Sequence, residues 1–149
     1  AEFKRHPYDP AAAKKLLTDA GYPNGFGITL DCPNDRYVND EAICQAVVGM
    51  LARIGVKVTL NAQSKTIVFP FYANKRDTSF YMLGWTPGSV DSWNVLYNIV
   101  GSVKKDGQGR IVRGLFNYGG WSSPQLDDLT DKILVETDKA KRDQMIAQA

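Results

Sequence analysis

The residue types best suited to binding a small molecule lie where a predicted strand ends. The stretch Ser79–Trp85 is nearly all apolar, which predicts a buried, central strand, and it runs directly into a loop with binding-type side chains. These side chains are two tryptophans, one carboxylate and one amide, from Trp85, Asp91, Trp93 and Asn94. Ligands of open α/β sheets bind beyond the carboxyl ends of strands, so the loop could form an aromatic wall with polar anchors.

Each of these side chains also has a structural interpretation. Trp85 could pack in the core, and Asp91 could cap a helix predicted over Ser92–Val100 or both cap it and bind ligand. Trp93 falls in the first turn of that helix, where core packing and ligand contact are equally compatible with the sequence. The pattern therefore predicts a binding loop and leaves the role of each residue open.

A second candidate lies in the loop after the first predicted strand, which contains Arg36 and Tyr37. An arginine at such a place could hold a carboxylate through two parallel hydrogen bonds. The alternatives for Arg36 are an exposed side chain or a salt bridge with Asp35 or Asp40.

No group of residues has the composition of a catalytic or metal centre. The only histidine, His6, lies near a terminus, so a catalytic triad built on it would lack a rigid scaffold. The sequence Gly107-Gln-Gly109 lacks the third glycine of a dinucleotide-binding fingerprint, and no P-loop is present. Cys32 and Cys44 are too few for a zinc site, which leaves a disulfide or two buried thiols. We therefore expect a protein without catalytic residues, bound metal or other cofactor.

Composition and charge exclude further classes of function. The 149 residues are 44% hydrophobic and 23% charged, as in soluble globular domains. The net charge of +2 is too small to favour nucleic acid or an anionic membrane surface as a partner. No apolar run reaches the roughly 20 residues that cross a bilayer, and Ala1–Tyr8 does not have the pattern of a signal peptide. The helical pattern of Asp138–Ala149 stops without a capping residue, so we expect the chain to be part of a longer protein.

The elements that must position these residues follow from the spacing of apolar side chains. Helical spacing predicts helices over Pro10–Ala20, Asp40–Ile54 with Asn39 as cap, part of Ser64–Lys75, Ser92–Val100, Pro124–Ile133 and from about Asp138. Alternation predicts short strands over Ile28–Cys32 and Val56–Ala62. The glycine-rich Gly101–Gly120 predicts a long loop, which is often functional. The alternation of helices and strands predicts a single α/β domain with helices packed on a short mixed sheet.

Several short motifs occur in the order and at the spacing of a known family. They are Tyr8-Asp-Pro10 followed by Ala13–Leu17, Ala20-Gly-Tyr-Pro-Asn-Gly25, Ile54-Gly-Val-Lys-Val58, Leu83-Gly-Trp85 with Asp91, Asn117-Tyr118, Ser122-Ser-Pro-Gln-Leu-Asp127, and Glu136-Thr-Asp138 with Lys141-Arg142. Together they resemble the family 5 solute-binding proteins, the peptide, dipeptide and nickel binders of ABC importers. The resemblance covers essentially the whole chain.

The resemblance implies a periplasmic-binding-protein-like lobe of type II in a two-lobed receptor, located in the periplasm or anchored at the cell surface. Residues 1–149 would form most of the C-terminal lobe, with the N-terminal lobe and the final strands absent. The receptor would capture peptides or peptide-like solutes for the permease subunits of an ABC importer, without binding nucleic acid and without membrane insertion of this part. The alternatives are a sensory or chaperone-type binding protein of the same fold, and a binder of an opine or sugar derivative.

The resemblance also bears on single residues. Dipeptide binders hold the ligand carboxylate with an arginine in the loop after the first strand of this lobe, and Arg36 occupies the matching place. They hold the ligand amine with an aspartate three residues after the loop tryptophan, where this chain has Gly88; Asp91 matches a second aspartate with a more structural role. The expected ligand-binding residues are Arg36, Tyr37, Trp85, Asp91, Trp93 and Asn94.

Overall fold

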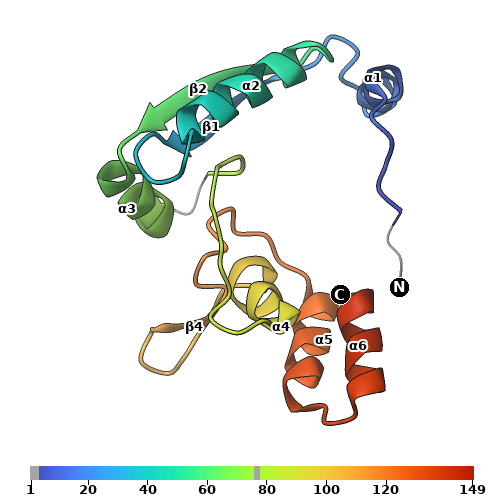
Figure 1. Ribbon diagram of the computed structural model, residues 1–149, viewed down its shortest axis with the longest axis vertical. Coiled ribbons are helices and arrows are strands. Elements are labelled where there is room, and N and C mark those ends of the chain that lie inside the picture. The colour runs from blue at the N-terminus through green and yellow to red at the C-terminus, as the bar shows by residue number, and fades with distance from the viewer. Residues whose placement is uncertain (1–3, 76–77) are drawn as a thin grey trace. The chain divides into compact units, whose positions relative to one another are not determined.

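The computed structural model describes residues 4–75 and 78–149, which group into two compact units (Figure 1). The β1–β2 unit contains residues 4–71 and 80–84. The α5–α6 unit contains residues 72–75, 78–79 and 85–149. Both mix helices with short sheets, as the sequence predicts for an α/β lobe.

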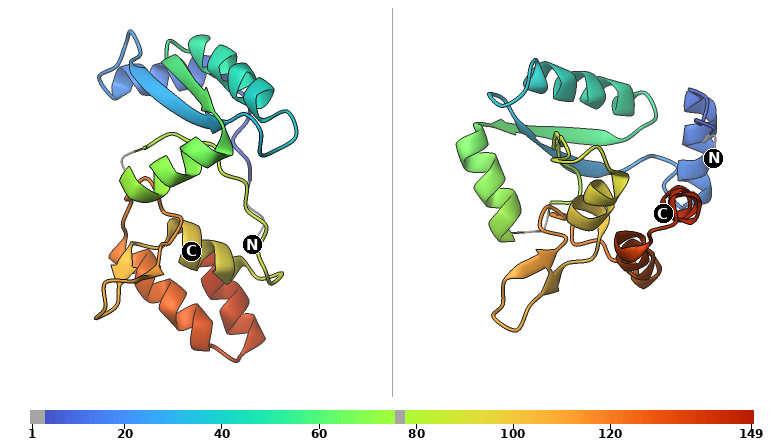
Figure 2. Two further views of the ribbon diagram at one scale, coloured as in Figure 1. Left: turned by 90° about the vertical axis from the view of Figure 1, so that its left-hand side faces the viewer. Right: turned by 60° about the horizontal axis from the view of Figure 1, so that its bottom comes forward.

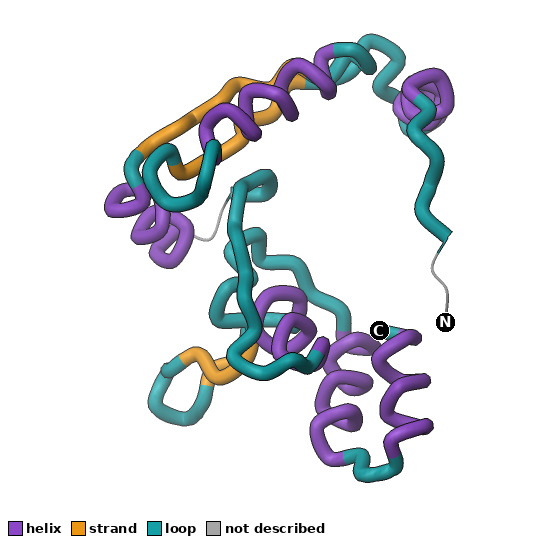
Figure 3. Tube along the Cα trace, viewed as in Figure 1, coloured by secondary structure: helices purple, strands orange, loops and turns teal. Residues whose placement is uncertain are grey.

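The β1–β2 unit is a parallel β-α-β arrangement. Strand β1 (Gly27–Pro33) pairs with β2 (Lys57–Gln63) from Gly27↔Lys57 to Pro33↔Gln63, and helix α2 (Asp40–Ala52) connects them. Helix α2 lies along both strands (Figure 3) and covers a core whose fully buried members are Leu30, Cys32 and Cys44. Helix α1 (Pro10–Asp19) precedes β1, and helix α3 (Lys65–Lys75) follows β2 with Pro70 inside it.

The predicted third strand, Ser79–Trp85, is wrong in extent and position. Only Tyr81 forms a bridge, parallel to Asp31 of β1, through backbone hydrogen bonds that Phe80 accepts at 3.1 Å and Met82 donates at 2.9 Å. Past this bridge the next residue of β1 on that side is Pro33, which has no N–H to donate, and the N–H of Gly84 donates to the hydroxyl of Tyr37 at 2.8 Å. The central place in the sheet therefore belongs to β1, with β2 on one side and this segment on the other.

The cysteines and Asn39 lie at the junction of β1 and α2. Cys32 and Cys44 form a disulfide between the end of β1 and the second turn of α2, and the Sδ atom of Met82 lies 3.7 and 3.6 Å from their sulfurs. The prediction that Asn39 caps α2 is wrong: its side chain makes no capping bond and its backbone is left-handed, with φ of 56°. The carboxylate at the start of α2 belongs to Asp40. It is buried and accepts hydrogen bonds from the backbone N–H groups of Arg36, Tyr37 and Glu41.

The α5–α6 unit is built from short helices and a small hairpin. Helix α4 (Ser92–Val95) continues into the π-helix η1 (Leu96–Val100), and strands β3 (Lys104–Lys105) and β4 (Ile111–Arg113) pair antiparallel. Helices α5 (Pro124–Val135) and α6 (Lys139–Gln148) then pack against each other (Figure 2). Ser123 and Asp138 cap them through their side chains, and both helices begin where the sequence predicts.

A buried ion pair ties the glycine-rich stretch to α5. The guanidinium of Arg113 bonds Asp127 at 2.9 Å and Asp131 at 3.1 Å, and its Nε donates to the carbonyl of Ser102. The amide of Asn117 donates to the carbonyls of Gly101 at 3.0 Å and Trp121 at 2.7 Å. The hairpin and this network replace much of the loop predicted over Gly101–Gly120, and they give Asn117 and Asp127 structural contacts in this chain.

Candidate functional site

The loop that carries Arg36 and Tyr37 is held by a buried carboxylate. Asp40 accepts hydrogen bonds from the backbone N–H groups of Arg36 at 2.9 Å, Tyr37 at 3.0 Å and Glu41 at 2.9 Å. These donors, that of Tyr37 first, hold the pKa of Asp40 below its usual value although burial acts in the opposite direction. The loop backbone is therefore fixed from inside the unit, and Asp40 is not free to pair with Arg36.

The other nearby carboxylate, Asp35, points toward the start of α3. It accepts hydrogen bonds from the N–H of Lys65 at 2.7 Å and the hydroxyl of Ser64 at 2.8 Å. These bonds, in that order, lower the pKa of Asp35. The salt bridges considered for Arg36, with Asp35 or Asp40, are thus both absent from the described part of the chain.

Arg36 is exposed and rests on an aromatic ring. Its Cζ lies 5.0 Å from the centroid of the Tyr37 ring, a cation–π distance, and it forms no ion pair with residues 4–75 or 78–149. The Tyr37 ring is itself held in place by the bond from Gly84 to its hydroxyl. A Cβ atom at Gly84 would lie 2.7 Å from Cε1 of Tyr37, so the close packing requires glycine. The arrangement presents an uncompensated guanidinium on a rigid platform after the carboxyl end of β1.

Trp85 and Asn94 meet in the α5–α6 unit. The indole N–H of Trp85 donates to Oδ1 of Asn94 at 2.9 Å, and the Trp85 ring lies 4.6 Å from the ring of Phe116. Trp85 is half-buried, and Nδ2 of Asn94 makes no hydrogen bond to a described residue. Part of the Trp85 ring and the two N–H groups on Nδ2 of Asn94 are therefore available to other partners.

Asp91 and Trp93 are engaged by the helices around them. Asp91 caps α4 by accepting from the N–H of Trp93 at 2.9 Å, and its second oxygen pairs with Arg142 of α6 at 2.7 Å. The Trp93 N–H first, and then Arg142, lower the pKa of Asp91. The indole N–H of Trp93 donates to the carbonyl of Thr130 at 3.0 Å, and its ring stacks on Tyr97. These contacts fasten α4 to α5 and α6.

The structure thus brings Arg36 and Tyr37 together in one unit, and Trp85 and Asn94 together in the other. Sequence reasoning missed Asp40 and Gly84 as the residues that position Tyr37. A signal was present for Asp40, since a carboxylate at the first position of a helix often bonds nearby N–H groups.

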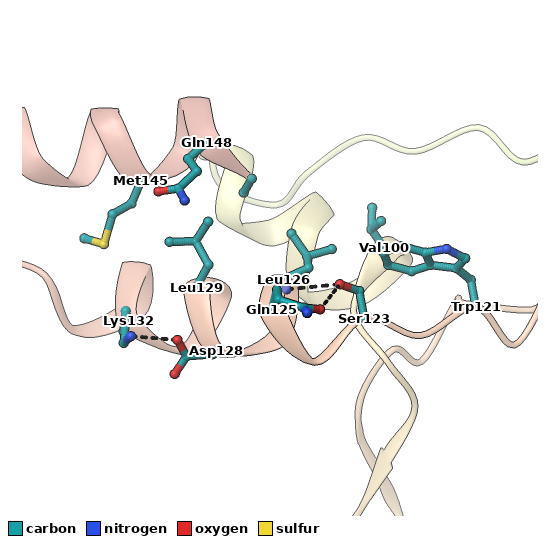
Figure 4. Close-up of a pocket in the computed structure, with 11 residues that line it drawn as sticks. Val100, Trp121, Ser123, Gln125, Leu126, Asp128, Leu129, Lys132, Met145 and Gln148 are labelled. Atoms are coloured by element: carbon teal, nitrogen blue, oxygen red, sulfur yellow. Dashed lines mark hydrogen bonds and ion pairs between the residues drawn. The ribbon is translucent and has the colours of Figure 1, made fainter.

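A separate cavity of about 710 Å³ lies between α5 and α6 (Figure 4). Its apolar lining comes from Val100, Trp121, Leu126, Leu129 and Met145. None of the expected ligand-binding residues lines it. This surface is therefore distinct from the two loops.

Residues 4–75 and 78–149 contain no group of three or more His, Cys, Asp or Glu side chains that could hold a metal ion. Within the same ranges, no helix has the length and apolar character needed to cross a membrane.

Comparison with known proteins gives consistent matches. Residues 1–107 match the family described as bacterial extracellular solute-binding proteins, family 5 Middle. The chain is 28% identical over 147 residues to the glutathione-binding protein GsiB of Pectobacterium atrosepticum, covering 96% of this chain and 27% of that protein. The chain therefore spans about a quarter of the length of this curated relative.

Solved structures agree in fold. The periplasmic binding protein DppA from Helicobacter pylori, in complex with the peptide STSA, has a TM-score of 0.76 at 25% identity, over 97% of this chain and 27% of that one. The binding protein AgaA of A. tumefaciens R10, in complex with agropinic acid, has a TM-score of 0.69 at 30% identity, over 90% and 26%. These similar proteins are binding proteins and not enzymes.

Proposed function

Because the chain belongs to family 5 of the bacterial extracellular solute-binding proteins, we propose that it is part of the solute-binding component of an ABC importer. It captures peptides or peptide-like solutes outside the cytoplasmic membrane, in the periplasm or at the cell surface, and delivers them to the permease. Relatives named for binding glutathione, a peptide and agropinic acid support this range of solutes.

The observation that carries the proposal is the uncompensated Arg36. A guanidinium matches the geometry of a carboxylate, and peptides, glutathione and opines all carry carboxylates. In this chain Asp35 and Asp40 accept hydrogen bonds from backbone N–H groups and from the hydroxyl of Ser64, so the guanidinium of Arg36 is left to pair with a solute. The Tyr37 ring below it restricts the side chain before binding, which lowers the entropy lost when the solute is bound.

Trp85 and Asn94 supply the second part of the proposal. An aromatic face and free amide donors suit the apolar and carbonyl groups of a peptide-like solute. Tyr37 contributes mainly as the platform of Arg36. Asp91 and Trp93 act on the solute through the position of α4 and of the loop that precedes it.

The test is a binding screen on the full-length protein with glutathione, the peptide Ser-Thr-Ser-Ala and agropinic acid, by isothermal titration calorimetry. At least one of these should bind, and Arg36→Gln should weaken its binding by about tenfold or more, since hydrogen bonds to charged groups contribute about 1.5–3 kcal/mol.

The matched control is Arg53→Gln, which removes the same charge from another exposed arginine of the same unit. It should change affinity by about twofold or less, because long-range effects of exposed charges are largely screened by salt. Failure of all three solutes to bind would refute the proposal.

A further inference from the structure

The indole ring of Trp85 is held by two side chains of its own unit. Its N–H donates to Oδ1 of Asn94 at 2.9 Å, and its ring centroid lies 4.6 Å from that of Phe116 at an interplanar angle of 59°. Aromatic pairs prefer tilted or offset arrangements at such distances. A hydrogen bond at one atom leaves the rest of a ring free to turn, whereas a second ring packed beside it blocks that rotation. Phe116 therefore limits which part of the half-buried Trp85 ring stays exposed.

Both partners of Trp85 are joined through Asn98 of the π-helix η1. Carbonyl groups in the last turn of a helix have no donor within that helix. Here the carbonyl of Asn98 accepts a hydrogen bond from the backbone N–H of Phe116 at 2.9 Å. The side-chain amide of Asn98 donates to the carbonyl of Asn94 at 2.8 Å. Phe116 and Asn94 are therefore bonded to the same residue, and η1 fixes their positions around Trp85.

A glycine lets the segment that carries Phe116 lie against the end of η1. The N–H of Gly114 donates to the carbonyl of Tyr97 at 3.0 Å, and the backbone of Gly114 is left-handed, with φ of 67°. A Cβ atom at Gly114 would lie 2.5 Å from the carbonyl oxygen of Gly101, so any other residue would push the two segments apart. Glycine at this position therefore allows Phe116 to reach Trp85.

We propose that Phe116 is a positioning residue of the solute site and acts on the solute through the orientation of Trp85. With Phe116 packed against it, the indole is ordered before binding, and its exposed part can receive an apolar group of a peptide-like solute. Without Phe116 the indole would have to be ordered during binding, which lowers affinity. The inference rests on the proposed solute-binding function and extends the role of Trp85 to a residue of the glycine-rich stretch.

The test is a double-mutant cycle in the full-length protein, made of the native protein, Phe116→Leu, Trp85→Leu and the double variant. Each is titrated by calorimetry with glutathione, with the peptide Ser-Thr-Ser-Ala and with agropinic acid. For a solute that the native protein binds, Phe116→Leu should weaken binding by about fivefold, the order expected for immobilising one more side chain. In the Trp85→Leu background the same change should alter affinity by about 1.5-fold or less, because an effect transmitted by Trp85 is lost with it.

Further variants separate positioning from general damage to the fold. Phe116→Tyr keeps the ring and should bind within about twofold of the native protein. Phe26→Leu is the matched control, because it removes a ring that packs on Tyr22 at 5.2 Å in the other unit, and it should also bind within about twofold. Phe116→Met has a similar volume and takes the place of Phe116→Leu in the cycle if the leucine variant does not fold. In fluorotryptophan NMR spectra, the resonance that is missing from Trp85→Leu should shift or broaden in Phe116→Leu.

Several results would overturn the inference and leave the proposed function standing. They are an equal loss of affinity from Phe116→Leu in both backgrounds, no loss in the native background, and native affinity in Trp85→Leu. A Trp85 resonance that does not respond to Phe116→Leu would contradict it as well. Absence of binding of all three solutes to the native protein would refute the proposed function, and the inference with it.

Discussion

The disulfide offers the sharpest quantitative prediction about the β1–β2 unit. Cys32 and Cys44 close a loop with a sequence separation of 12 residues, and that loop contains Arg36 and Tyr37. In the chain-entropy treatment, a cross-link over a loop of this length restricts the unfolded chain and stabilises the folded one by about 3 kcal/mol. Replacing both cysteines by alanine should remove that contribution, together with the contact to Met82.

The assay is native-state hydrogen exchange on the double variant Cys32→Ala/Cys44→Ala and on the native protein. The free energy of opening for amides of β1 and β2 should fall by about 3 kcal/mol. Amides of α5 and α6 belong to the other compact unit and serve as the internal control, with an expected change below about 0.5 kcal/mol. A fall below about 1 kcal/mol in β1 and β2 would show that the loop is held by Asp40 and the core without help from the disulfide.

Three further predictions concern the scaffold of the site. Gly84→Ala should displace the Tyr37 ring and weaken solute binding, because its Cβ would lie 2.7 Å from that ring, whereas Gly88→Ala has open space and should bind normally in the same titration. Asp40→Asn should reduce the loss of stability at acid pH, measured as the free energy of unfolding in urea across a pH series. The folded-state pKa of Asp40 is lowered, so its stabilising contribution is present above the unfolded pKa of about 3.9 and is lost as pH falls through the folded pKa. The same loss of stability at acid pH in the variant and the native protein would contradict this. Arg113→Met should destabilise the α5–α6 unit by about 3 kcal/mol, because it strands Asp127, and hydrogen exchange in α5 as stable as in the native protein would refute the role of this pair.

The helices with local end signals were predictable from the sequence. Asp9, Ser123 and Asp138 each cap the helix that follows, and a proline stands at the first position of α1 and α5. These interactions span three residues, so a single sequence contains the partners. The same holds for Asp91, whose capping bond to the N–H of Trp93 was one of the two interpretations given.

Interactions between distant residues were not predictable. The strand expected over Ser79–Trp85 is reduced to one bridge, and Gly84 bonds the side chain of Tyr37, 47 residues away, in place of a strand. Asn39 does not cap α2 as expected. Asp40 lies at the helix start, and its carboxylate accepts hydrogen bonds from the N–H groups of Arg36 and Tyr37 in the loop before it. Arg113 was overlooked because its partners lie in α5, beyond the glycine-rich stretch. Arg36 could be predicted as a binding candidate from its position in the loop. Only the structure shows that it forms no salt bridge with Asp35 or Asp40, because both carboxylates bond other groups.

The central claim, that Arg36 reads the carboxylate of the solute, is tested most directly by a double-mutant cycle in the full-length protein. Native protein and Arg36→Gln are each titrated with Ser-Thr-Ser-Ala and with its C-terminal amide. We predict that the native protein prefers the free acid by about tenfold or more, and that Arg36→Gln reduces this preference to about threefold or less. An equal preference for the acid in both proteins would contradict the account.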